Sequence, residues 1–156
     1  MGIFNRSHYE DVVITRVHGW ITGKEAQRRL RQIRGFEQML TKNGTRILKF
    51  FLHISKAEQK TRLLARLEDP EKRWKFSRQD LRERGYWKAY QKSFEEALPV
   101  TSTEGAPWFI VPANHKWYRN LVVADLLVRA LEDMDPRPPK IHGLDWKKLR
   151  REVSRS

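Results

Sequence analysis

Residues 46–77 read RILKFFLHISKAEQKTRLLARLEDPEKRWKFS, and this stretch decides how the chain folds. It opens with an apolar and aromatic run over residues 47–54, which is interrupted by two polar side chains only. Such a run is typical of a strand buried on both faces, as in a parallel sheet. Ser55 then takes the place of a helix N-cap, with Glu58 at the spacing of a capping box, and a helical pattern continues to Leu67.

A basic loop follows this helix. The helix is expected to end at Asp69, because the residue before a proline is disfavoured in the α conformation. Three cations then surround two aromatic rings, and a strand that leads through a helix into such a loop favours a site for a highly anionic ligand. A solvated surface turn explains the same residues equally well. The residues concerned are Lys72, Arg73, Trp74, Lys75 and Phe76.

The composition of the chain is strongly basic. Its 156 residues include 32 Lys and Arg against 19 Asp and Glu, a formal net charge of +13, and no cysteine. The charge indicates attraction to polyanions such as nucleic acid, polyphosphate or nucleotides, and the missing thiols exclude disulfides and thiolate metal sites. No stretch has the length of a membrane span or the pattern of a signal peptide. We therefore expect a cytoplasmic protein without a membrane partner.

The remaining segments alternate between strand and helix patterns. Residues 9–17 fit a helix, although their β-branched side chains also suit a strand. This order predicts an α/β fold with a parallel sheet, whose ligand lies beyond the carboxyl ends of the strands. The other expected elements are the end of a strand over 1–4, helices over 23–42, 78–98 and 121–134, and a strand over 107–112. Pro99 is expected to end the helix over 78–98.

Three polar loops are expected at those carboxyl ends. They are Asn5–Glu10, Ser55 together with the basic loop, and Pro112–Arg119, and all carry cations. We expect them to converge on one anion site. His53 is predicted to be a satisfied histidine of the core or beside the site, and the aromatic side chains Trp87, Tyr90 and Phe94 are predicted to be core.

Four segments resemble the polyphosphate kinase 2 family, and together they place the chain in its C-terminal half. The resemblance covers residues 2–134. It implies a partial P-loop kinase-like parallel sheet flanked by helices, with a helical lid, lacking the N-terminal strands. It also implies phosphoryl transfer between inorganic polyphosphate and nucleoside mono- or diphosphates, with Mg²⁺ as cofactor. The segments are GIFNRSHYEDV, FFLHISKAEQKTRLLARLEDPEKRWKFS, DLRERGYWKAY and TSTEGAPWFIVPANHKWYRNLVVADLL.

The resemblance also implies roles for individual residues. Asn5 and Arg6 stand where the family has its Walker B region, so Arg6 is expected to hold a phosphate. Asn5, where several branches carry aspartate, is expected to hold Mg²⁺ through its amide oxygen, directly or through water. Residues 56–92 match the lid, whose cations clamp the transferring phosphates. The candidate phosphate ligands are Arg62, Arg66, Lys72, Arg73 and Lys75 in the lid, with Lys116 and Arg119 near the last strand.

The Walker A motif of the family has no counterpart in these 156 residues. Residues 19–25 read GWITGKE, with three residues instead of four between the glycines and Glu25 after the lysine. Walker A supplies the backbone and lysine that cradle the phosphates. We therefore expect a truncated, catalytically incomplete form, whose expected partners are an N-terminal half or further copies of the chain.

Residues 1–135 are interpreted as the kinase-like part, and residues 136–156 as a basic tail that contains prolines. Two other functions remain open, a non-catalytic polyphosphate-binding protein and a nucleic-acid-binding protein. The second is disfavoured, because the cations gather at the expected strand ends and no known nucleic-acid-binding motif occurs.

Overall fold

The computed structural model describes residues 1–139 and 143–156. It divides into two compact units, Met1–Ala124 and Asp125–Ser156. The elements in chain order are α1 (Glu10–Val17), α2 (Gly23–Lys42), β1 (Lys49–His53), α3 (Lys56–Glu68), the 3₁₀ turn η1 (Arg73–Lys75), α4 (Arg78–Gly85), α5 (Trp87–Thr101), β2 (Trp108–Pro112), α6 (Lys116–Met134) and α7 (Trp146–Val153).

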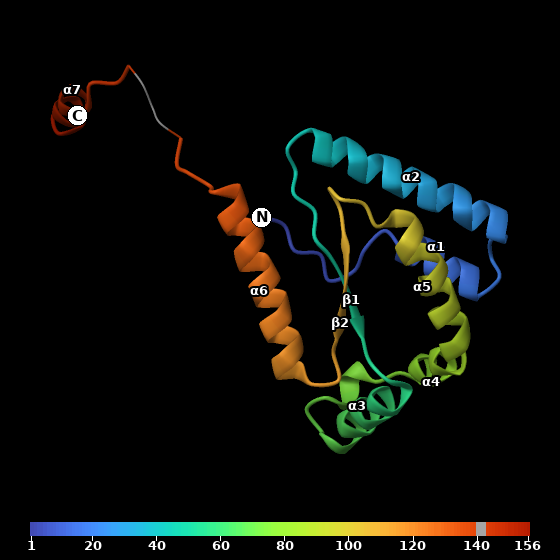
Figure 1. The fold of residues 1–156 in the computed structure, drawn as a ribbon. Helices are drawn as coiled ribbons and strands as arrows, with labels where there is room; N and C mark the ends of the chain where they lie inside the picture. The colour runs from blue at the N-terminus through green and yellow to red at the C-terminus, as the bar shows by residue number, and fades with distance from the viewer. Residues whose placement is uncertain (140–142) are drawn as a thin grey trace. The chain divides into compact units, whose positions relative to one another are not determined.

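The two strands form a parallel sheet in the first unit (Figure 1). Lys49 pairs with Trp108 at the amino ends, and His53 pairs with Pro112 at the carboxyl ends. Parallel neighbours require a long crossover connection, which α3 to α5 provide here. The predicted α/β class with a parallel sheet is confirmed, although β1 is shorter than the apolar run that predicted it.

Helices α1, α2 and α5 pack against one another beside the sheet (Figure 1). Apolar side chains at helical spacing build this core, and Leu30 in the middle of α2 is only 2% exposed. Thr22 caps α2 by accepting a hydrogen bond from the Glu25 backbone N–H at 3.2 Å. The core cluster consists of Tyr9, Val12, Ala26, Leu30 and Ala97.

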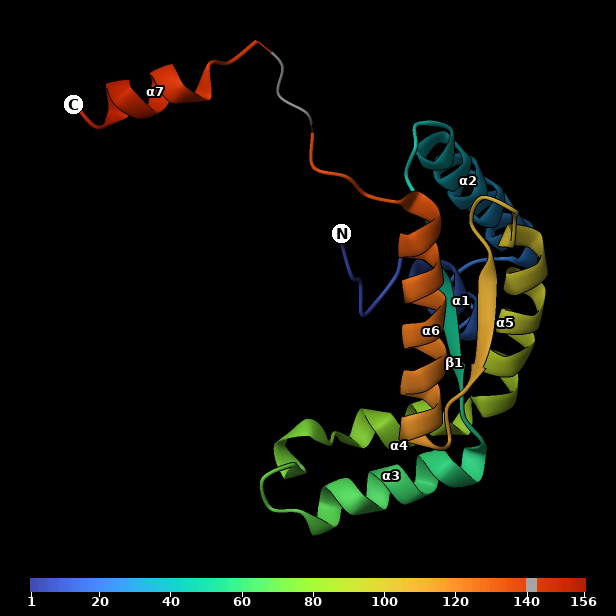
Figure 2. The ribbon, with the colours of Figure 1, turned by 60° about the vertical axis from the view of Figure 1, so that its left-hand side comes forward.

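A segment of α3, η1 and α4, residues 56–85, lies beyond the carboxyl end of β1 (Figure 2), and we call it the arm. Ser55 caps α3 as predicted, by accepting from the Glu58 N–H at 3.1 Å. Asp69 ends α3 in an extended conformation, as expected before Pro70. Ser77 and Asp80 then form a capping box that starts α4. Treatment of residues 56–92 as a lid stays a prediction.

The structure corrects two predicted helix boundaries. The single helix expected over 78–98 is two helices, because the chain turns at Tyr86 after Gly85, a residue of low helix propensity. Pro99 does not end α5, which continues to Thr101. A proline so near the last turn removes one backbone donor only, and the Thr101 hydroxyl bonds the Ala97 carbonyl at 2.8 Å.

One further prediction from the sequence was wrong, and a second was right in one of its two alternatives. Met1–Phe4 forms no strand, and Ile3 and Phe4 are 81% and 85% exposed. No strand within the described ranges lies beside this segment to supply the hydrogen bonds that a strand needs. His53 is exposed at the end of β1, so it is no core residue, but its position agrees with the other alternative, a histidine beside the site.

The second unit contains the end of α6 and the short helix α7. Asp145 caps α7 by accepting from the backbone N–H groups of Lys147 and Lys148, both at 3.0 Å. The basic tail thus contains a short helix, while residues 140–142 of the tail lie outside the described residues. Among the described helices, none combines the length and the apolar character needed to cross a bilayer.

Candidate functional site

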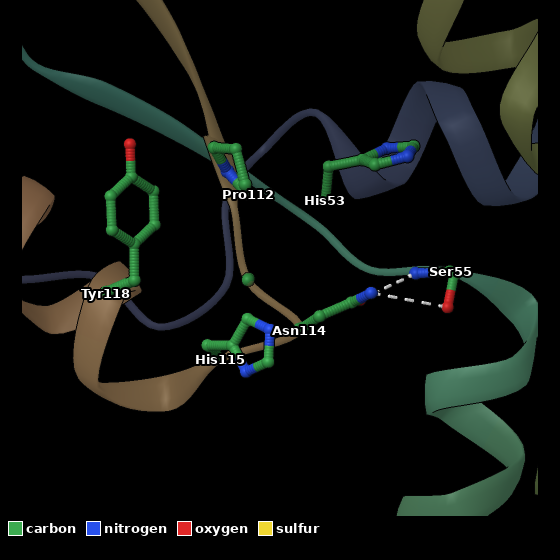
Figure 3. A pocket seen from close by; sticks show the side chains of 7 residues that line it. His53, Ser55, Pro112, Asn114, His115 and Tyr118 are labelled. Atoms are coloured by element: carbon green, nitrogen blue, oxygen red, sulfur yellow. Dashed lines mark hydrogen bonds between the residues drawn. The ribbon is translucent and has the colours of Figure 1, made fainter.

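A cavity of about 370 Å³ opens at the carboxyl ends of β1 and β2 (Figure 3). This is the edge of a parallel sheet where ligands bind in α/β folds. The loop after each strand contributes to the walls, as two of the three loops were predicted to do. The lining residues are His53, Ser55, Pro112, Ala113, Asn114, His115 and Tyr118.

Asn114 fixes these two loops to each other. Its Oδ1 atom accepts from the Ser55 backbone N–H at 2.9 Å, and its Nδ2 atom reaches the Ser55 hydroxyl at 3.5 Å (Figure 3). The Ala113 N–H also donates to the His53 carbonyl at 2.7 Å, which extends the strand pairing by one bond. The rim of the cavity is thus held by hydrogen bonds of backbone and amide groups.

Arg62 joins the arm to this rim. Its Nε donates to Glu58 at 2.8 Å, and its Nη2 donates to the carbonyls of Ala113 at 2.6 Å and Asn114 at 3.1 Å. A guanidinium has five N–H donors, so its Nη1 group is still able to donate to a ligand. Arg62, predicted as a phosphate ligand, therefore also holds the arm to the loop after β2. The sequence pattern did not indicate this second role.

The cations of the basic loop lie exposed on the arm. Lys72 pairs with Asp69, and this hydrogen bond is the main cause that lowers the pKa of the Asp69 carboxyl. Arg73 Nε donates to the Leu67 carbonyl at 2.8 Å, and the Lys75 ammonium lies over the Trp74 ring at 5.1 Å. Exposed ion pairs are weak, so a polyanion is able to replace these contacts at small cost. Arg66, half-buried on α3, lies one turn beyond Arg62.

The first turn of α6 places two more predicted cations directly after the cavity residue His115. Lys116 is exposed, and Arg119 donates to the Asn120 side chain through Nε at 3.1 Å and Nη2 at 2.8 Å. Trp117 between them is 68% exposed. These cations flank the cavity but do not line it.

The third predicted loop takes a different position. Arg6 is exposed and lies 3.8 Å from Glu10, and neither Asn5 nor Arg6 lines the cavity. The loop is anchored by Tyr9, whose ring lies 5.0 Å from that of Trp108, at the amino end of β2. The structure thus brings two of the three loops to the cavity, while Tyr9 of the third loop contacts Trp108 at the amino end of β2.

The residues near this loop do not fit a magnesium site by themselves. Within residues 1–139 and 143–156, no three His, Cys, Asp or Glu side chains are grouped to hold a metal ion. Asn5 offers a neutral amide oxygen, whereas Mg²⁺ sites are built on carboxylates and phosphates. The nearby Glu10 is paired with Arg6.

A buried polar network was missed by the sequence analysis. Lys49 Nζ lies 2.6 Å from Glu37 Oε2, and the two side chains are 7% and 3% exposed. Lys49 also donates to Tyr9 Oη at 3.1 Å and to the Thr101 carbonyl at 2.8 Å. Tyr9 in turn donates to Glu37 Oε1 at 2.9 Å. Burial lowers the pKa of the Lys49 ammonium, and Glu37 opposes this effect. The sequence did contain a signal for this network: Lys49 is a charged residue within an apolar strand, and Glu37 is a charged residue on the apolar face of a helix.

A sequence model of the family described as Polyphosphate kinase 2 (PPK2) matches residues 1–139. The chain belongs to the polyphosphate kinase 2 family. It is 54% identical over 138 residues to an AMP/ADP-polyphosphate phosphotransferase of Meiothermus ruber, an alignment that covers 88% of this chain and 52% of that protein. It is 45% identical over 152 residues to an ADP-polyphosphate phosphotransferase of Rhodopseudomonas palustris, covering 90% of this chain and 53% of that protein.

A solved structure supports the same assignment. The crystal structure of polyphosphate kinase 2 from Arthrobacter aurescens matches with a TM-score of 0.90 at 50% identity, over 99% of this chain and 54% of that one. The predicted family is therefore confirmed. The chain spans about half the length of these polyphosphate kinase 2 relatives.

Proposed function

We propose that this chain is the polyphosphate-holding part of a phosphotransferase that moves phosphoryl groups between inorganic polyphosphate and nucleoside mono- or diphosphates. One observation carries the proposal: the arm presents three exposed cations on one short loop beyond the carboxyl end of β1, where an α/β fold binds its ligand. The names of the relatives supply the substrates, polyphosphate with AMP or ADP.

The chemistry assigned to these residues is electrostatic. A transferring phosphoryl group spreads negative charge over its oxygens, and positioned cations stabilise that charge. Arg62 and Arg66 on α3, with Lys116 and Arg119 on α6, would flank the same polyanion, and Arg6 would hold a phosphate from the third loop. The proposal of magnesium rests on the family alone, because Asn5 is the one ligand predicted from the sequence and the described residues contain no acidic group built for a metal ion.

The 156 residues hold no Walker A motif, so we infer that catalysis by these residues needs a polypeptide with the N-terminal half of the family, since a further copy of this chain, the other expected partner, brings no Walker A motif. The alternative is a non-catalytic polyphosphate-binding protein, which the three exposed cations of the basic loop support equally. Nucleic acid is the weaker candidate ligand, since the exposed aromatic and basic residues follow no recognised binding motif.

Polyphosphate binding at several salt concentrations tests the proposal. Replacing Lys72, Arg73 and Lys75 by Ala should weaken binding and flatten the dependence of log K on log salt by about 2, at roughly 0.7 per lost contact on a flexible polyanion. The matched control replaces Lys147, Lys148 and Arg150 on α7, which removes equal charge from the tail. Equal losses in both variants would show that general charge, and not the arm, binds polyphosphate.

A further inference from the structure

One polar contact in the first unit ties the C-terminal end of the arm to helix α1. His18 follows the last turn of α1, and its Nε2 atom lies 3.2 Å from Oε2 of Glu83, near the end of α4. The two residues are 65 positions apart in the sequence, so no local pattern predicts this contact. Their side chains are 16% and 29% exposed, which shields the pair from most of the solvent and strengthens it.

Aromatic rings hold the imidazole in place. The His18 ring stacks on the Trp20 ring, with centroids 5.0 Å apart. It also meets the ring of Tyr86 edge to face, again with centroids 5.0 Å apart. Tyr86 is the residue at which the chain turns between α4 and α5. The imidazole therefore packs directly on the turn at the base of the arm.

Glu83 contacts α5 as well. It accepts a hydrogen bond from the Tyr90 hydroxyl at 2.7 Å. The sequence analysis placed Tyr90 in the core together with Trp87 and Phe94, but each is only partly buried. The Tyr90 hydrogen bond is the main cause that lowers the pKa of the Glu83 carboxyl, which is thus ionised at neutral pH. An ionised carboxylate only accepts hydrogen bonds, so His18 donates to it through Nε2.

The backbone at the turn is not fixed by packing. An added Cβ atom at Gly85 would meet no atom of another element within 4 Å. Glycine also has more backbone freedom than any other residue. The angle between α4 and α5 therefore depends on side-chain contacts across the turn, and Glu83 makes such contacts with both α1 and α5.

The two helices of the arm are tied to each other. Arg84 on α4 donates through Nη1 to the Lys56 carbonyl at 2.7 Å and to Gln59 Oε1 at 2.8 Å, both in the first turn of α3. A change of angle at Tyr86 is therefore carried through the arm to the basic loop. The eight residues of α4 are about 12 Å long, so a rotation of about 10° moves its far end by about 2 Å. Displacements of this size matter for group transfer, which depends on the exact position of the reacting groups.

We propose that His18 is a positioning residue: through its hydrogen bond to Glu83 it sets the angle of the arm, and with it the place of the basic-loop cations beyond the strand ends. His18 does not line the cavity of Figure 3, so it acts through Glu83 and the arm. Arg62 holds the other leg of the arm to the rim. The inference rests on the proposed function only in assigning polyphosphate to the basic-loop cations.

Distances between two spin labels, measured by pulsed EPR, test the proposal. The chain has no cysteine, so Glu71→Cys in the arm and Gln38→Cys on α2 place one label on each side of the turn, both at exposed positions. Dilution with unlabelled chain keeps the measured distances within one molecule. His18→Asn should broaden the distance distribution, because losing a hydrogen bond to a charged group raises the population of displaced arms by about tenfold.

His18→Gln is the matched control. Its amide nitrogen reaches as far along the side chain as the histidine Nε2 atom and is able to donate to Glu83, whereas the shorter asparagine corresponds to Nδ1. Both variants lose the ring that stacks on Trp20. His18→Gln should therefore keep the distance distribution of the parent chain. Glu83→Ala, which removes the acceptor instead of the donor, should broaden the distribution as His18→Asn does.

Three results would overturn the inference: a broad distribution in the parent chain, an unchanged distribution in His18→Asn or Glu83→Ala, or equal broadening in His18→Gln and His18→Asn. Circular dichroism of each variant shows that it has folded. A fall in thermal stability of His18→Asn without broadening would assign His18 a purely structural role. Broadening in His18→Asn but not in His18→Gln, in a chain that fails to bind polyphosphate, would refute the proposed function and leave the positioning role standing.

Discussion

Lys49 is the residue whose surroundings matter most to this fold. It begins β1, yet its ammonium lies in a closed network of acceptors beside the rings of Tyr9 and Trp108, at 5.3 and 5.2 Å from their centroids. Strand, helix and loop segments far apart in the sequence meet at this one group. Within the described residues, every buried side-chain nitrogen and oxygen has a hydrogen-bond partner.

Replacing Lys49 by Ala should destabilise the protein by about 3–5 kcal/mol, because it leaves the buried Glu37 carboxylate without its ammonium partner, with only the Tyr9 hydroxyl and His8 Nε2 beside Oε1. Urea unfolding followed by tryptophan fluorescence measures the loss. The double variant Lys49→Met with Glu37→Leu should recover much of it, since it removes both charges. Lys88→Ala, on the exposed side of α5, is the control. A loss below 1 kcal/mol in Lys49→Ala would mean that water reaches the pair.

Single residues were predictable where the signal was local. Ser55 caps α3 as its spacing to Glu58 indicated, since a cap depends on residues within one helical turn. The contacts of Arg62 were not predictable, because Ala113 and Asn114 lie 51 and 52 residues away in the sequence. The Lys49 network depends in the same way on tertiary packing.

At the scale of elements, the arm is held to the sheet by few contacts, and Arg62 supplies two of them. Arg62→Ala should raise the hydrogen-exchange rate of the first-turn amides of α3 by about tenfold to a hundredfold, the equivalent of losing charge-assisted hydrogen bonds worth about 1.5–3 kcal/mol. The amides of α2 should not change. Arg66→Ala, one turn further along α3, is the matched control. Equal exchange in the two variants would show that Arg62 does not join the arm to the rim.

Element types followed from hydrophobic periodicity, but several boundaries did not. Helix α2 begins and ends at the bounds expected from the sequence, residues 23–42, and the Asn43-Gly44 pair that follows it is typical of a helix C-terminus. The division between α4 and α5 was missed, because the apolar pattern continues across Tyr86 while the backbone turns. The strand expected over residues 1–4 needed a neighbour that sequence patterning does not register. Convergence of all three loops on one anion site stays a prediction, since Asn5 and Arg6 do not line the cavity and Tyr9 is held by contacts with residues far away in the sequence.

On the scale of the whole molecule, the described sheet has only two strands, and each has an edge without a partner strand among the described residues. Two-stranded sheets are marginal in water, and all-parallel sheets occur almost only with both faces covered. Large apolar side chains are exposed nearby in the first unit, with Leu52, Ile110 and Trp117 at 46%, 64% and 68%. The relatives reported above are about twice as long as this chain. Their additional residues are able to cover such surfaces.

We therefore expect the purified 156-residue chain to be oligomeric or aggregated, because unpaired strand edges and exposed apolar surface both drive association. Co-expression with the N-terminal half of a relative should give a soluble complex. That complex, unlike the chain alone, should phosphorylate AMP or ADP from polyphosphate, since the added half brings the Walker A cradle. Sedimentation velocity, thermal unfolding and a coupled kinase assay measure these outcomes. An Arg6→Ala variant of the complex should lose activity if this side chain holds a phosphate. A compact monomer that unfolds in one sharp transition and is unchanged by the added half would show that the exposed edges need no partner and that the chain is a domain in its own right.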